Sequence, residues 1–149
     1  MALFEKVNED IKTAMKERDK VALETLRNIK KVFLEAKTAP GANDTLEDAD
    51  ALKIIQKLAK QGKESAQTYI DAGRQDLADA ELAQVSVIER YLPEQLSEAE
   101  IEKIVKTLID QTGAASMKDM GKVMGMANKQ LAGKADGKTI SGIVKKLLA

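Results

Sequence analysis

The chain of 149 residues contains no cysteine and no histidine. Without cysteine it has no disulfide, thiolate nucleophile, thiolate zinc site or iron–sulfur cluster. Without histidine it lacks the commonest general base and the commonest transition-metal ligand, which excludes a serine–histidine–acid triad. The sequence therefore indicates no metal and no cofactor, and an enzyme built from it would depend on Lys, Tyr, Asp or Glu alone.

Long apolar runs are also absent. No segment approaches the roughly 20 consecutive apolar residues that a membrane-spanning helix needs. The first ten residues mix charges of both signs and contain no apolar stretch typical of a signal peptide. We therefore expect no membrane partner and a cytosolic location.

Proline and aromatic residues are scarce, with two prolines in the chain and an aromatic content of 3%. A hydrophobic content of 44% beside 32% charged residues is typical of a folded protein rather than a disordered one. The stretches between the prolines are rich in Ala, Leu, Lys, Glu and Gln, which favour helices, and runs of alternating β-branched residues are missing. The sequence predicts an all-α fold.

Residues 1–93 are expected to form a four-helix N-terminal domain. The predicted helix ends are an N-cap at Asp19, a loop over 38–44, a capping box of Thr45 with Asp48, a stop at Gly73 and an N-cap at Asp76. Helical spacing assigns these residues to the buried stripes: Leu3, Val7, Ile11, Met15, Leu23, Leu26, Ile29, Phe33, Leu52, Ile55, Ala59, Gly62, Ala66, Tyr69, Val87 and Tyr91.

Residues 94–149, after Pro93, are expected to form a small three-helix tail domain. Its predicted signals are a Ser97–Glu100 capping box, a stop at Gly113, a start at Ser116 and Asp119, a stop at Gly133 and an N-cap at Asp136. The residues expected to face inward are Ile101, Ile104, Val105, Leu108, Ile109, Met117, Met120, Met124, Ala127, Leu131, Ile140, Ile143, Val144 and Leu147.

Charge is balanced over the chain, with 24 basic and 24 acidic residues, but not along it. Residues 114–149 hold seven lysines against Asp119 and Asp136, a net charge of +5. On a continuous helix Lys118, Lys122 and Lys129 fall within about 40° of one another. Further candidate RNA-binding lysines are Lys134 and Lys138 in the following turn and Lys145 on the last helix.

Such a basic surface suits a phosphate backbone. The alternative is an ordinary solvated helix face, and lysine lacks the bidentate geometry of arginine. No aromatic residue lies among these lysines, so stacking on unpaired bases is not expected.

Gly121 and Gly125 lie inside the predicted methionine-rich helix, with Asn128 on the same flank. An interior glycine costs about 1 kcal/mol relative to alanine, which favours a close backbone approach at these positions. A neighbouring helix or a sugar-phosphate backbone could make that approach. We favour the neighbouring helix, because so small a domain must pack tightly.

The segment Gly133–Lys138 contains two glycines and two lysines and could be taken for a phosphate loop. It lacks the preceding strand and the spacing of a Walker motif. A helix stop at Gly133 followed by an N-cap at Asp136 explains the same residues, and we favour that structural interpretation.

Two groups of acidic residues could in principle act in acid–base chemistry or bind a hard cation. They lie where predicted helices begin, and negative charge there interacts favourably with the helix dipole. Capping therefore explains them without a site. They are Glu47, Asp48 and Asp50, and Glu98, Glu100 and Glu102.

Five sets of short motifs are spread over nearly the whole chain. They are Leu26-Arg27; Glu64-Ser65 with Tyr69 and Ala72-Gly73-Arg74; Tyr91-Leu92-Pro93-Glu94-Gln95-Leu96-Ser97; Asp119-Met120-Gly121-Lys122-Val123-Met124; and Gly133-Lys134-Ala135-Asp136-Gly137. Together they resemble the GatB/YqeY family, and in particular its free-standing YqeY-type members. Two positions depart from the family pattern: Gly62, where an arginine is more typical, and Asn128 in the second tail helix.

The resemblance implies a four-helix domain followed by a three-helix tail. The tail is similar to the C-terminal domain of the B subunit of the glutamine-dependent amidotransferase that converts mischarged transfer RNA, and in that enzyme the tail contacts transfer RNA. The kinase-like cradle and the glutaminase of that enzyme have no counterpart in this chain. A label of carbon–nitrogen ligase with glutamine as amido-N-donor would therefore be inherited from the larger relative.

We expect a non-catalytic accessory protein whose basic tail binds structured RNA, with transfer RNA as the first candidate and a translation-related protein as a further partner. One alternative is an amidotransferase component that acts in trans on mischarged transfer RNA. Another is a protein-interaction module that uses the long third helix. Salt separates these hypotheses, because RNA binding weakens steeply as salt rises whereas an apolar helix contact does not.

Overall fold

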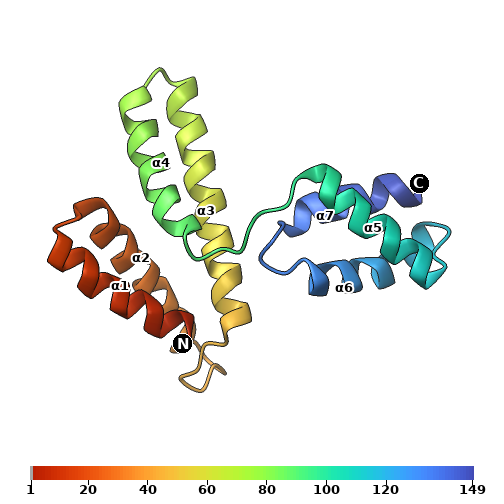
Figure 1. Cartoon of the computed structure of the whole chain (residues 1–149), viewed down its shortest axis with the longest axis horizontal. Coiled ribbons are helices and arrows are strands. Elements are labelled where there is room, and N and C mark those ends of the chain that lie inside the picture. The colour runs from red at the N-terminus through yellow and green to blue at the C-terminus, as the bar shows by residue number, and fades with distance from the viewer. Residues whose placement is uncertain (1) are drawn as a thin grey trace. The chain divides into compact units, whose positions relative to one another are not determined.

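The computed structural model describes residues 2–149 and contains seven α-helices, one short 3-10 helix and, within those residues, no strand (Figure 1). This confirms the all-α prediction. The chain divides into two compact units, residues 1–92 and residues 93–149. Each unit has a hydrophobic core of its own.

Unit 1 consists of two helical hairpins, α1 with α2 and α3 with α4 (Figure 1). The helices are α1 (Leu3–Glu17), α2 (Lys20–Lys37), α3 (Asp48–Asp71) and α4 (Gln75–Glu89). Its buried core contains Val7, Ala14, Ala22, Leu26, Ile29, Phe33, Ala51, Ile55, Ala59, Val87, Ile88 and Tyr91. Most of the predicted stripes meet in this core, and the predicted residues that are not part of it are Met15, Leu52, Gly62, Ala66 and Tyr69.

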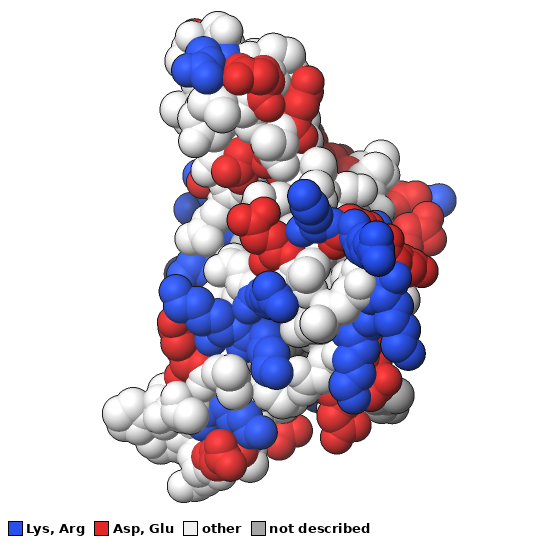
Figure 2. Space-filling view, turned by 90° about the vertical axis from the view of Figure 1, so that its left-hand side faces the viewer, with Lys and Arg blue, Asp and Glu red and all other residues white. Residues whose placement is uncertain are grey.

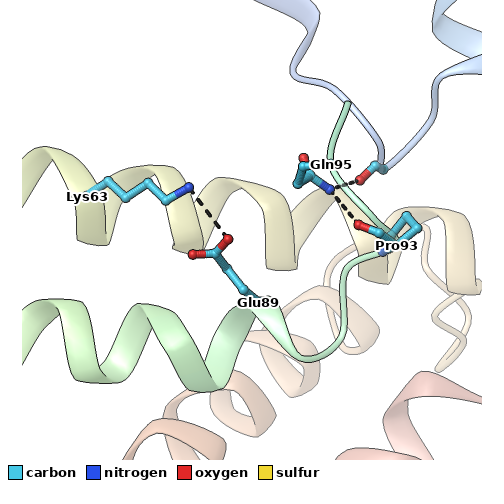
Figure 3. A network of polar contacts seen from close by, with 5 residues as sticks. Lys63, Glu89, Pro93 and Gln95 are labelled. Atoms are coloured by element: carbon cyan, nitrogen blue, oxygen red, sulfur yellow. Dashed lines mark hydrogen bonds and ion pairs between the residues drawn. The ribbon is translucent and has the colours of Figure 1, made fainter. Parts of the chain in front are cut away.

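Helices α3 and α4 approach each other closely at Gly62. A Cβ atom built on Gly62 would lie 2.5 Å from Val85 Cγ2, closer than real side chains approach. Next to this contact, Lys63 Nζ lies 3.6 Å from Glu89 Oε2 in an exposed ion pair between the two helices (Figure 3). The missing side chain at position 62 is thus a packing requirement of this chain.

Two predicted helix ends in unit 1 are confirmed. Asp19 Oδ1 accepts a hydrogen bond from a backbone N–H in the first turn of α2 (3.1 Å). After α3, Gly73 has a φ of +74°, and the N–H groups of Gly73 and Arg74 donate to the carbonyl oxygens of Ile70 (3.0 Å) and Tyr69 (2.8 Å). This is the hydrogen-bond pattern of a Schellman motif, which glycine favours because it has no Cβ.

The predicted capping box of Thr45 with Asp48 is wrong. Helix α3 begins at Asp48 itself, and its N-cap Glu47 makes no side-chain cap bond. Asp48 Oδ1 instead accepts a hydrogen bond from the N–H of Leu3 (3.0 Å), so it satisfies a donor in the first turn of α1. Thr45 Oγ1 donates to the carbonyl oxygen of Ala42 (2.7 Å) within the loop.

The predicted N-cap at Asp76 is also wrong, because α4 begins one residue earlier, at Gln75. Asp76 therefore lies inside the first turn. Its carboxylate accepts hydrogen bonds from Arg74 Nε and Nη2, both at 3.2 Å. The Arg74 guanidinium lowers the pKa of Asp76.

Two methionines assigned to the core are exposed. Met15 is 54% exposed and Ala14 is buried in its place. Each step of four residues turns about 40° beyond a full turn, so a stripe counted in fours from Leu3 leaves the buried face by Met15. Met117 is 46% exposed because it belongs to the short 3-10 helix that precedes α6.

Unit 2 packs three α-helices around a second core. Its elements are α5 (Glu98–Thr112), the 3-10 helix η1 (Met117–Asp119), α6 (Met120–Gln130) and α7 (Gly137–Leu148). The buried residues are Ile101, Val105, Leu108, Val123, Ala127, Leu131, Ala135, Ile140, Val144 and Leu148. Val123, which the sequence analysis did not assign, replaces Met117 in this core.

The predicted start and end of α5 are confirmed. Glu100 N donates to Ser97 Oγ (3.2 Å), and Ser97 N donates to Glu100 Oε2 (3.1 Å), which completes a capping box. Gly113 ends the helix with a φ of +69°.

Candidate nucleic-acid interface

Helix α6 has one apolar face and one basic face. Val123 and Ala127 are fully buried, whereas Lys122 and Lys129 are exposed. The two lysines are seven residues apart, so they lie within about 20° of each other around the helix. No acidic residue lies in α6. The outer face of the helix is therefore purely basic.

Lys118 precedes this face in η1 and is exposed as well. Ser116 Oγ accepts a hydrogen bond from Lys118 N (3.4 Å), and Asp119 Oδ2 accepts one from Ala115 N (3.1 Å). Ser116 is the N-cap of η1 and Asp119 is the N-cap residue of α6, as predicted, although Asp119 makes no side-chain cap bond to α6. The spread of about 40° predicted for Lys118, Lys122 and Lys129 assumed a continuous α-helix. Because a 3-10 helix has about three residues per turn, that angle does not hold for Lys118.

Gly121 and Gly125 are exposed, and a Cβ atom built on either would meet nothing within 4 Å. The expected close contact with a neighbouring helix is therefore wrong. Gly125 follows Lys122 by three residues and precedes Lys129 by four, which places it between the two lysines on the outer face. The glycines leave the backbone open to solvent where the positive charge is concentrated.

The turn after α6 is anchored by the segment that opens unit 2. Gln95 Nε2 donates to the carbonyl oxygen of Gly133 (2.7 Å) and to the carbonyl oxygen two residues before itself (2.9 Å), as Figure 3 shows. Leu96 N donates to the carbonyl oxygen of Lys134 (3.0 Å). Helix α6 ends at Gln130, so Gly133, with a φ of +76°, lies within this turn and does not end the helix directly.

Asp136 forms the N-cap of α7, where its Oδ1 accepts hydrogen bonds from Lys138 N (2.7 Å) and Thr139 N (3.0 Å). The carboxylate occupies the N–H groups that a phosphate loop would offer to an anion. Lys138 and Lys145 are exposed and share one side of α7, because they too are seven residues apart.

The candidate lysines carry charge that the chain itself does not neutralise. The ion pairs formed within residues 2–149 involve the basic residues Lys12, Lys63, Arg74 and Lys106. None involves Lys118, Lys122, Lys129, Lys134, Lys138 or Lys145. The structure therefore presents two basic helix faces, on η1–α6 and on α7, with Lys134 in the turn between them.

The acidic groups do not form a metal site in the part of the chain that the structure describes, where no three His, Cys, Asp or Glu side chains converge on one point. Glu100 acts in the capping box of α5, and Asp48 binds the first turn of α1. The arrangement of unit 2 thus offers cationic and backbone groups to a ligand.

The match to known families covers almost all of the chain. The family model described as Yqey-like protein matches residues 4–148. The chain belongs to the YqeY-like family. The motifs in both units led to the same family, so this prediction is confirmed.

The relatives of this YqeY-like chain include three fungal proteins named "Altered inheritance of mitochondria protein 41, mitochondrial". The protein of Pyrenophora tritici-repentis is 30% identical over 85% of this chain, and that of Vanderwaltozyma polyspora is 26% identical over 76%. The protein of Meyerozyma guilliermondii is 33% identical over 61%. The matches span 69%, 64% and 47% of the lengths of these relatives, respectively.

These names correct the expected location. The cytosolic assignment, made from the first ten residues, is wrong because all three relatives are named as mitochondrial proteins. Among residues 2–149, no helix is both long enough and apolar enough to span a membrane.

Sequence reasoning missed one exposed lysine of the tail, Lys146. It follows Lys145 on α7, about 100° further around the helix. The net charge of +5 over residues 114–149 counts Lys146, so the charge balance of the tail was the signal that indicated a seventh lysine.

Proposed function

We propose that this YqeY-like protein is a non-catalytic accessory protein whose tail binds structured RNA, with transfer RNA as the first candidate. The observation that carries the proposal is the outer face of α6, where exposed and unpaired Lys122 and Lys129 flank Gly125 and no carboxylate intervenes. A phosphate backbone is the ligand that such a face suits best.

The side chains of this face favour recognition of the shape of an RNA over recognition of its base sequence. Lysine contacts a phosphate as a point charge, and no aromatic side chain is present to stack on a base. Open glycines let a sugar-phosphate backbone approach the helix closely. We therefore infer recognition of folded RNA through its backbone, with little dependence on base identity.

The test is transfer-RNA affinity across a salt series for the full chain and for a variant with Lys118→Gln, Lys122→Gln and Lys129→Gln. Each lost phosphate contact should reduce the log–log salt slope by up to about 0.9, and several folded RNAs should be affected alike. The matched control changes three exposed lysines of α3, Lys53, Lys57 and Lys60, to Gln. Equal loss in both triple variants, or salt-independent wild-type binding, would contradict the proposal.

The exposed glycines allow a second test, in which protein stability and RNA affinity should change in opposite directions. Replacing Gly121 and Gly125 by Ala should stabilise the protein by up to about 1 kcal/mol each, because both lie in open space on a helix. The same change should weaken RNA binding if the backbone approaches closely. A more stable variant with a lower RNA affinity would separate this interface from a packing effect.

One observation favours a different function, a protein-interaction module on the α3–α4 hairpin. Ile70, near the α3–α4 turn, is 40% exposed, and Leu82, midway along α4, is 42% exposed. Residues 64–89 hold six acidic side chains and one basic side chain, and Figure 2 shows more acidic than basic surface at the upper end of this face. Wild-type protein that binds no RNA, or whose binding does not depend on salt, would favour this protein-interaction function.

The amidotransferase alternative has a separate test. If the chain alone released ammonia from glutamine, and a point substitution in it abolished that activity, the non-catalytic proposal would be wrong. The absence of cysteine and histidine supports the expectation that no ammonia is released.

A further inference from the structure

The outer surface of α6 offers a hydrogen-bond acceptor that the proposed phosphate contacts do not use. Asn128 is exposed, and within residues 2–149 its side-chain amide takes part in no hydrogen bond. Lys122 and Lys129 on the same helix can only donate, so they pair with acceptors such as phosphate oxygens. An amide both donates and accepts, so Asn128 can also pair with a donor of the ligand, which a lysine cannot do.

Asn128 lies on the flank of α6 that carries the two glycines. Gly121 precedes it by seven residues and Gly125 by three, which places them about 20° and about 60° from it around the helix. Gly125 lies about 40° from Lys129 on its other side. The order around the helix is therefore amide, glycine, lysine.

The glycines allow a short side chain on this flank to reach a ligand. A Cβ atom built on Gly121 or Gly125 would meet nothing within 4 Å, so the backbone here is open to solvent. The amide of asparagine ends closer to the backbone than the ammonium group of lysine does. Asn128 therefore contacts a ligand only where the helix itself comes close, and two neighbouring positions without side chains permit that approach.

The backbone of RNA carries a group that matches this amide. Phosphate and ring oxygens of the backbone only accept hydrogen bonds, whereas the ribose 2′-hydroxyl both donates and accepts. In a double-stranded stem these hydroxyls line the wide, shallow minor groove. A helix whose lysines contact the phosphates beside that groove presents its glycine flank, with Asn128, to the ribose groups.

We propose that Asn128 is a specificity-determining residue that selects RNA over DNA, because its amide oxygen accepts a hydrogen bond from a ribose 2′-hydroxyl of a double-stranded stem. This inference rests on the proposed RNA-binding function and adds the substrate class, since lysine contacts to phosphates do not distinguish RNA from DNA. One such hydrogen bond changes affinity about fivefold, independently of the base sequence.

The test compares two stem-loops of identical sequence, one of RNA and one in which fluorine replaces every ribose 2′-hydroxyl. Fluorine removes the donor, adds little bulk and keeps the A-form geometry of the stem, so a difference in affinity reports the hydroxyl groups. In fluorescence anisotropy at one salt concentration, the full chain should bind the RNA stem about fivefold more tightly than the fluorinated stem.

Two variants assign that preference to a residue. Asn128→Leu should weaken binding of the RNA stem about fivefold and leave binding of the fluorinated stem unchanged. Leucine is a better helix former than asparagine, so α6 should be retained, which circular dichroism and thermal melts check. Gln130→Leu is the matched control, because Gln130 is another exposed amide of α6 and lies about 160° from Asn128 around the helix. It should keep the preference.

Failure of this inference is distinguishable from failure of the proposed function. Wild type that binds neither stem, or that binds without salt dependence, contradicts the proposed function and this inference with it. Salt-dependent binding that weakens when Lys118, Lys122 and Lys129 are changed to Gln supports the RNA interface. If both stems then bind wild type equally, or Asn128→Leu keeps the preference, or Gln130→Leu loses it to the same extent, the role of Asn128 alone is overturned.

Discussion

The fold changes the chemistry of the Tyr91 side chain. It lies just after α4, is 8% exposed and donates its hydroxyl hydrogen to Asp10 on α1. Burial raises its pKa above the ordinary value of 10.0, and the bond to Asp10 adds to the shift. The folded protein therefore holds this proton more tightly than the unfolded chain does.

The pH dependence of stability follows from that difference. Below about pH 10 the phenol is protonated in both states, and its contribution to stability is complete. Above about pH 10 the unfolded chain loses the proton first, so the free energy of unfolding should fall as the pH rises.

Chemical denaturation from pH 7 to pH 11 should show a steeper alkaline loss for wild type than for Tyr91→Phe. At pH 7 the variant should be less stable by about 1 kcal/mol, because Asp10 loses its donor. Tyr69→Phe is the control, because it removes the other tyrosine hydroxyl of the chain and leaves the hydrogen bond between Tyr91 and Asp10 intact. Parallel pH profiles for wild type and Tyr91→Phe would show that another group governs the alkaline range.

At the scale of the element, the contact between α3 and α4 depends on one position. Gly62→Ala should destabilise unit 1 by about 1–3 kcal/mol, because its new methyl group would overlap Val85 Cγ2. Val85→Ala alone should also destabilise, by leaving a small cavity. In the double variant the two losses should not add, and thermal melts of all four proteins measure this coupling.

Gly125→Ala serves as the control for this series. It also adds one methyl group to a helix, but in open space, so it should raise the melting temperature. Equal effects at Gly62 and Gly125 would mean that helix propensity alone, without the α3–α4 contact, accounts for the change.

Helices were predictable from sequence because apolar spacing and strong caps are local signals. Asp19, Gly73 and the Ser97–Glu100 box each act within a few residues of the chain, and the structure has them as predicted. Asp48 was misassigned because its partner, Leu3 N, lies 45 residues away. Gly121 was misassigned for a similar reason, since only the packed unit shows that no helix faces it.

The candidate sites differ in the same way. The lysines of α6 and α7 were identifiable because a basic helix face needs only regular spacing within one element. The hydrogen bond between Tyr91 and Asp10 was not identifiable, because the two residues are 81 positions apart and become neighbours only when unit 1 forms its core.

At the scale of the whole molecule, the two separate cores predict that each unit folds alone. Residues 1–92 and residues 93–149, expressed separately, should each give a helical circular dichroism spectrum and a cooperative melt. The shorter fragment should be the less stable, because a domain of about 60 residues buries a smaller share of its surface.

A shortened fragment tests the boundary itself. Residues 97–149 lack Gln95 and Leu96, whose hydrogen bonds hold Gly133 and Lys134, and should melt at a lower temperature than residues 93–149. Equal stability of the two fragments would place the start of the domain after Leu96. An unfolded fragment 93–149 would show that the tail depends on unit 1.

The contact of Gly62 with Val85 also has an evolutionary consequence. A side chain at position 62 is compatible with this hairpin only if position 85 becomes smaller or the helices separate, so the two sites should vary together among related proteins. Where a related protein has arginine at position 62, we expect a residue smaller than valine at position 85 or a wider spacing of α3 and α4.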